Sequence, residues 1–136
     1  MQRLPWLPPE VSIIESQKDT HPYTHYPITV ALSDYPQYAN ADFTNACVVP
    51  QNCGIGFNAF GFYPCTTAAA IDRIFGFNKG KKELPPEEYT FLDELSCFCR
   101  LCGFFNRSLN LKDSVSPQWQ KALQRYKEHP PSLTQY

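Results

Sequence analysis

Cys53-Gly54-Ile55-Gly56-Phe57-Asn58-Ala59-Phe60-Gly61-Phe62-Tyr63-Pro64-Cys65 is the stretch of sequence on which the fold depends. It is rich in glycine and aromatic residues and carries a cysteine at each end. The four residues from Asn58 to Gly61 predict a tight β-hairpin in which Gly61 adopts a backbone angle that other residues disfavour. We expect this hairpin to bring Cys53 and Cys65 to one side of it.

A short helix is expected directly after the hairpin. Thr66 or Thr67 is a suitable N-cap for residues 68–75, and Gly76 is a suitable residue to close the helix.

Two further helices are predicted nearer the C-terminus. Residues 85–101 begin with two prolines and two glutamates, which favour the first turn of a helix, and Gly103 is expected to close it. Its apolar stripe comprises Tyr89, Leu92, Leu95 and Phe98. The last helix follows Ser116-Pro117 and ends before Pro130.

The N-terminal third of the chain has a different character. It is rich in proline and contains two short runs with the composition of β-strands, at residues 11–14 and 28–32. Two such strands cannot bury both of their faces alone, so residues 1–40 are interpreted as the margin of a larger unit or as a linker.

Composition excludes several classes of protein. Of the 136 residues, 43% are hydrophobic, and 12 basic against 13 acidic side chains give a net charge of −1. The net charge argues against a general nucleic-acid binder. The predicted hairpin and short helices lead us to expect a small, cysteine-rich α+β domain. The apolar runs are too short to span a membrane, and no secretory signal is visible, so a cytoplasmic location is predicted.

Six cysteines are many for a chain in a reducing compartment, where they are more often metal ligands than disulfides. They form two groups, Cys47, Cys53 and Cys65, and then Cys97, Cys99 and Cys102. The spacing of Cys99 and Cys102 lets two thiolates converge on one centre. Spacing alone leaves a structural zinc and an iron–sulfur cluster equally open.

A family resemblance favours the cluster. Gly61-Phe62-Tyr63-Pro64-Cys65, with Cys53-Gly54 before it and Cys99-Arg100-Leu101-Cys102-Gly103 after it, resembles the SPASM/twitch auxiliary domains of radical SAM enzymes. In that family a cysteine and glycine lead into a hairpin that ends in a Tyr-Pro-Cys segment, and a later C-x-x-C completes the cluster. The resemblance covers residues 25–110, and its hairpin segment is one residue shorter than the commonest form.

The resemblance implies a [4Fe–4S] cluster in residues 41–105, a helix and tail in 106–136, and the last strands of a partial (β/α) barrel in 1–40. The ligands it implies are Cys53, Cys65, Cys99 and Cys102, with Cys47 as a replacement or extra ligand and Cys97 as the weakest candidate. Such a cluster serves electron transfer or substrate positioning.

The chain also departs from the family. It has no C-x-x-x-C-x-x-C motif, which in radical SAM enzymes binds the catalytic cluster. We therefore expect no catalytic residue here, and S-adenosylmethionine only through a core domain joined in cis or in trans, acting on a peptide or small-molecule substrate. The alternative is a zinc-stabilised four-cysteine interaction module without catalytic activity.

Overall fold

The computed structural model describes residues 28–45, 47–106 and 115–132, without the side chains of residues 51–53. The α-helices and strands, in chain order, are α1 (Val48–Cys53), β1 (Gly56–Asn58), β2 (Gly61–Tyr63), α2 (Thr66–Phe75), α3 (Leu92–Cys99) and α4 (Pro117–Glu128). The short 3₁₀ helices are η1 (Leu32–Asp34), η2 (Pro36–Tyr38) and η3 (Gly103–Phe105).

The predicted hairpin is confirmed. β1 and β2 pair antiparallel with Asn58 opposite Gly61, and the Asn58 side chain accepts a hydrogen bond from the Phe60 amide at 2.8 Å. Gly61 has a φ of 128°, and a Cβ at this position would lie 2.5 Å from the Lys81 carbonyl oxygen. Glycine is therefore required here both by the backbone angle and by the close approach of the neighbouring chain.

The helix after the hairpin is also confirmed, and its cap differs from the prediction. α2 ends at Gly76, which has a φ of 73° in the left-handed region. Its N-cap is Cys65, whose sulfur accepts a hydrogen bond from the Ala68 amide, so neither Thr66 nor Thr67 caps the helix. Threonine was expected because oxygen is the usual capping atom.

The helix predicted over residues 85–101 is wrong at both ends. α3 begins only at Leu92, because Phe91 has a φ of 55° and breaks the helical backbone. The helix ends at Cys99, well before Gly103, which instead begins η3. Leu92 is 52% exposed, so the apolar stripe buried by α3 is shorter than expected.

The strand predicted over residues 28–32 is wrong as well. The Ala31 amide donates to Ser116 Oγ at 2.8 Å, and the Thr29 carbonyl accepts from the Ser116 amide at 3.1 Å. These backbone groups are therefore bound to the segment before α4, and the chain then turns into η1. This leaves no barrel strand at residues 28–32, while the strand predicted over residues 11–14 lies outside the described residues.

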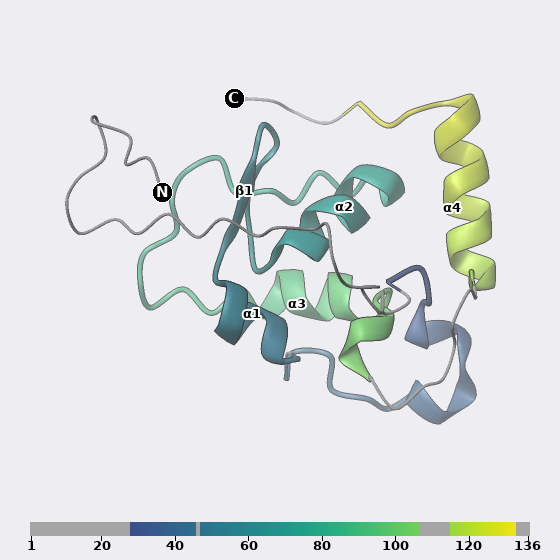
Figure 1. The fold of residues 1–136 in the computed structure, drawn as a ribbon, viewed down its shortest axis with the longest axis horizontal. Coiled ribbons are helices and arrows are strands. Elements are labelled where there is room, and N and C mark those ends of the chain that lie inside the picture. Colours follow the sequence, from purple (N-terminus) through teal and green to yellow (C-terminus); the bar gives the residue numbers. More distant parts are fainter. Residues whose placement is uncertain (1–27, 46, 107–114, 133–136) are drawn as a thin grey trace, which may run out of the picture.

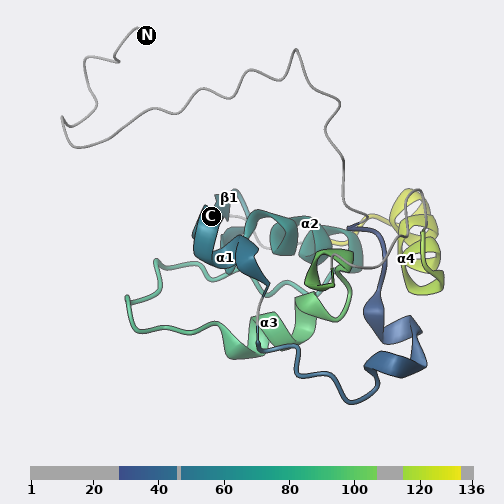
Figure 2. The same ribbon diagram turned by 60° about the horizontal axis from the view of Figure 1, so that its bottom comes forward.

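α2 is at the centre of the described part of the chain. It contacts the hairpin, α3 and α4, and Figures 1 and 2 show α3 beside it and α4 at its C-terminal end. Tyr63, Ile71 and Phe98 are buried between these elements, as is Trp119 of α4. The arrangement confirms a small α+β fold. Within the described residues no helix is long and apolar enough to cross a membrane.

Candidate metal centre

Four cysteines line one cavity. Cys47 precedes α1, Cys65 lies between the hairpin and α2, and Cys99 and Cys102 lie at the end of α3. The remaining wall is formed by Val49, Pro50, Pro64, Thr67, Ala68, Ile71, Leu95, Phe98, Phe104 and Phe105. The cavity has a volume of about 20 Å³, which is room for about one water molecule. Three separate segments therefore bring thiols to one small and mostly apolar space.

Cys65 is held at the N-terminus of α2. Its sulfur accepts a hydrogen bond from the Ala68 amide at 3.4 Å. Because Pro64 connects it directly to β2, the hairpin and the helix together fix the position of this thiol. The N-terminus of a helix stabilises negative charge, so it is a suitable position for a thiolate bound to a metal.

Cys99 and Cys102 are connected by a tight turn. The Leu101 amide donates to the Phe98 carbonyl at 3.0 Å, and the Cys102 amide donates to the Cys99 carbonyl at 3.2 Å. This turn, residues 99–102, is called the C-x-x-C turn below. It returns the chain toward the cavity, so both of its thiols line the same space.

Burial strongly affects these two thiols. Burial raises the pKa of Cys102 to about 12, although the nearby backbone N–H groups of Phe104 and Phe105 act in the opposite direction. Burial also raises the pKa of Cys99, and the nearby Cys102, Cys65 and Cys47 raise it further. In the absence of a cation Cys99 and Cys102 therefore stay protonated at neutral pH, and binding of a metal ion by these two thiols must release protons.

The other two cysteines are placed differently. Cys97 does not line the cavity, and its charged neighbours are Lys79, Asp72, Arg100 and Glu94. Cys53 is the last residue of α1, and its side chain is not among those described. Its predicted role as a ligand stays a prediction.

The four thiols share a cavity but are not arranged around one point. Within residues 28–45, 47–106 and 115–132, no three Cys, His, Asp or Glu side chains lie close enough to hold a metal ion as they stand. A tetrahedral zinc needs four sulfurs about 2.3 Å from one ion, so the thiols would have to move inward. In a cluster each thiolate binds a different iron, so the sulfurs lie further apart and the cavity would have to widen.

Two hydrogen bonds to the C-x-x-C turn from outside the cavity were not predicted from the sequence. The Ser33 amide donates to the Arg100 carbonyl at 3.0 Å, and Trp119 Nε1 donates to the Leu101 carbonyl at 2.7 Å. A buried tryptophan usually finds a partner for its N–H, but its spacing from the turn carries no signal of which carbonyl that is.

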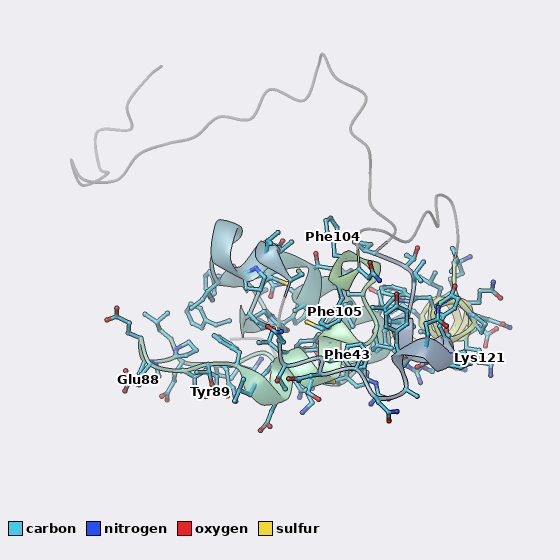
Figure 3. All side chains as sticks on the ribbon, turned by 90° about the horizontal axis from the view of Figure 1, so that it is seen from below. Phe43, Glu88, Tyr89, Phe104, Phe105 and Lys121 are labelled. Carbon is cyan, nitrogen blue, oxygen red and sulfur yellow. The ribbon has the colours of Figure 1, made fainter. Side chains whose placement is uncertain are left out.

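Aromatic rings close one side of the site. The rings of Phe43 and Phe105 lie 5.2 Å apart between centroids, and Figure 3 shows these two residues together, with Phe104 next to them. Phe104 and Phe105 belong to the cavity wall, so Phe43 adds a second layer outside it. Such a hydrophobic layer limits the access of water to a bound metal.

Comparisons with models of protein families, with curated proteins and with solved structures found no match to this chain.

Proposed function

We propose that this chain binds a metal centre through Cys47, Cys65, Cys99 and Cys102, and that the centre is an iron–sulfur cluster. The observation that carries the proposal is that these four thiols, from three separate segments, line one cavity. Cys53, which the resemblance also implies as a ligand, stays a candidate, since its side chain is not among those described.

Several features support a cluster. Clusters are held by cysteine thiolates, and their reduction potentials depend on amide hydrogen bonds to sulfur and on burial. Here the Ala68 amide donates to the Cys65 sulfur, and the backbone N–H groups of Phe104 and Phe105 act to lower the pKa of Cys102. When bound, a cluster would supply one-electron transfer. This agrees with the role of an auxiliary domain beside a radical SAM core, which would be a separate domain or a separate chain.

One observation favours a second candidate, a structural zinc. The cavity has a volume of about 20 Å³, which suits a single ion better than a cluster. Zinc bound by four thiolates would join three segments and act as a structural element of an interaction module.

Anaerobic reconstitution with ferrous iron and sulfide tests the proposal. The protein should turn brown and show the broad visible absorption of thiolate-to-iron charge transfer. Cys65→Ser and Cys102→Ser should lose this absorption, because each removes a ligand, and metal content measured by mass spectrometry should fall with it. Cys97→Ser is the matched control and should keep the colour, since its thiol lies outside the cavity.

The other outcomes are equally clear. A colourless protein that holds one zinc per chain would replace the cluster by the zinc candidate. A protein that takes up neither metal would exclude both. If Cys53→Ser removes the cluster and Cys47→Ser does not, the ligand set is the one that the resemblance implied.

A further inference from the structure

The C-x-x-C turn is fixed from its outer side by two distant parts of the chain. The carbonyl of Arg100 accepts a hydrogen bond from the Ser33 amide, and the carbonyl of Leu101 accepts one from Trp119 Nε1. Arg100 and Leu101 are the two residues between the cysteines of the turn. The peptide groups that set the distance between Cys99 and Cys102 are therefore held by residues that do not touch the cavity.

Trp119 is itself rigidly placed. It is 2% exposed, and its ring meets the ring of Phe75 edge-on with centroids 5.1 Å apart. Leu101, which receives its hydrogen bond, is 3% exposed. A buried carbonyl that loses its donor costs free energy, so the bond strongly selects one orientation of the turn.

We propose that Trp119 is a positioning residue for the metal centre, acting through its hydrogen bond to the Leu101 carbonyl. This inference rests on the proposed function. Groups that orient metal ligands without binding the metal commonly change the affinity 10–100-fold when they are removed. Because coupling between two equilibria is reciprocal, metal binding must in turn strengthen the contact of α4 with the turn.

Trp119→Phe is the decisive variant, because it keeps an aromatic ring beside Phe75 and removes the N–H donor. We expect the affinity for Zn²⁺ and Co²⁺, measured by competition with a chelator, to fall about 10–100-fold. The visible bands of bound Co²⁺ should also shift, since they report the geometry of its ligands. Tyr126→Phe is the control: it removes a hydrogen bond from Arg73 to the same helix and leaves the C-x-x-C turn untouched.

A second measurement uses the protein with its indole in place. The chain has two tryptophans, so Trp6→Phe leaves Trp119 as the single fluorescent indole. Titration with Zn²⁺ should change its emission in step with occupancy of the cavity. This titration decides the question if Trp119→Phe does not fold.

The outcomes separate the two proposals. If the parent protein binds neither Zn²⁺ nor Co²⁺ and takes up no iron and sulfide, both the proposed metal centre and the positioning role of Trp119 are wrong. A parent that binds metal while Trp119→Phe binds it within threefold overturns the positioning role alone. If that variant is unfolded, an unchanged Trp119 emission at full occupancy overturns it equally.

Discussion

Gly56 of β1 has no Cβ, and this lets it lie close against the backbone of Cys65, the N-cap of α2. A Cβ at this position would lie 2.9 Å from the Cys65 carbonyl carbon and oxygen, and 2.9 Å from the Thr66 amide nitrogen. These are backbone atoms and cannot move aside as the end of a side chain can. The position of Cys65 in the cavity thus depends on a glycine nine residues before it.

Gly56→Ala should therefore weaken the site as well as the fold. Overpacking of this kind typically costs about 1–3 kcal/mol in the free energy of unfolding, measured by urea denaturation. Because Cys65 has to shift, the affinity for Co²⁺ should fall too. Gly76→Ala is the control: it forces alanine to a φ of 73° at a position that does not line the cavity, so this variant should lose stability and keep its affinity for Co²⁺. If Gly56→Ala and Gly76→Ala bind Co²⁺ with equal affinity, the position of Cys65 does not depend on Gly56 in this way.

At the scale of elements, Glu94 connects α3 to the chain beside the hairpin. Its carboxylate lies 2.8 Å from Lys81 Nζ and accepts a hydrogen bond from the Tyr89 hydroxyl at 3.1 Å. Lys81 in turn pairs through its backbone with Phe62 of β2. Glu94 is only 4% exposed. Because it lies on α3 and Lys81 is paired with β2, the ion pair joins the hairpin to the helix that carries Cys99.

The charge of Glu94 predicts a dependence of stability on pH. Burial acts to raise the pKa of Glu94, but hydrogen bonds from Lys81 and Tyr89 hold it below the ordinary value of 4.5. A lowered pKa means that the carboxylate stabilises the fold above pH 4.5 and that this contribution is lost as the pH falls through the value in the folded protein.

Glu94→Gln should accordingly lower the free energy of unfolding at pH 7 by about 1 kcal/mol, a modest value because Lys81 is partly exposed. The difference in the free energy of unfolding between the parent and this variant should become smaller at pH values well below 4.5, where Glu94 of the parent is protonated and therefore also uncharged. Urea denaturation at several pH values measures this. The exposed Glu87→Gln is the control, and a difference that stays constant over the whole pH range would exclude the assignment.

Some of these elements could be predicted from the sequence and others could not. The hairpin and α2 could be predicted because Gly61 lies in the turn of the first and Gly76 closes the second. Residues 28–32 have the composition of a strand, but their backbone groups bind a segment 85 residues away, from Ser116 to Ala31. The sequence of residues 85–91 is typical of the start of a helix. In the structure the helix begins only at Leu92, and the Tyr89 hydroxyl donates a hydrogen bond to Glu94. A contact between distant residues decided the first case, whereas the second involves a local hydrogen bond between residues five apart.

The residues of the candidate site also differ in whether the sequence could identify them as candidates. Cys65, Cys99 and Cys102 could be selected from their spacing and from the glycine and proline residues beside them. The choice between Cys47 and Cys53 could not be made, because it depends on how α1 lies against the rest of the chain. The hydrogen bond from Trp119 could not be predicted either, since it joins residues 18 apart in the sequence.

At the scale of the whole molecule, hydrogen bonds join the N-terminal segment of the described chain, residues 28–34, to the start of α4 and the residue before it. Besides the bonds between Ser116 and residues 29–31, the Gln118 amide donates to Asp34 at 3.0 Å. Ser33, in the same N-terminal segment, donates to the C-x-x-C turn, and so does Trp119 in α4. The N-terminal segment and α4 are therefore fixed to one another and to the same turn.

Ser116 is the residue on which this connection depends most directly. It is 2% exposed, and its hydroxyl is the acceptor for the amide of Ala31, which is fully buried. Ser116→Ala would leave that amide without its acceptor in a site closed to water. The free energy of unfolding should fall by about 1–3 kcal/mol, measured by urea denaturation. Ser96→Ala, at an exposed position of α3, is the control and should change stability by less than about 0.5 kcal/mol.

Because the N-terminal segment and α4 reach the turn through different carbonyls, Ser116→Ala should also affect the metal site, but less than Trp119→Phe does. Loosening of the two ends leaves the indole hydrogen bond in place, so we expect Co²⁺ affinity to fall by less than about 10-fold. A larger loss than in Trp119→Phe would mean that the segment containing Ser33 positions the turn more strongly than the indole does. The Ser33 amide would then be the more important of the two supports of the cysteines.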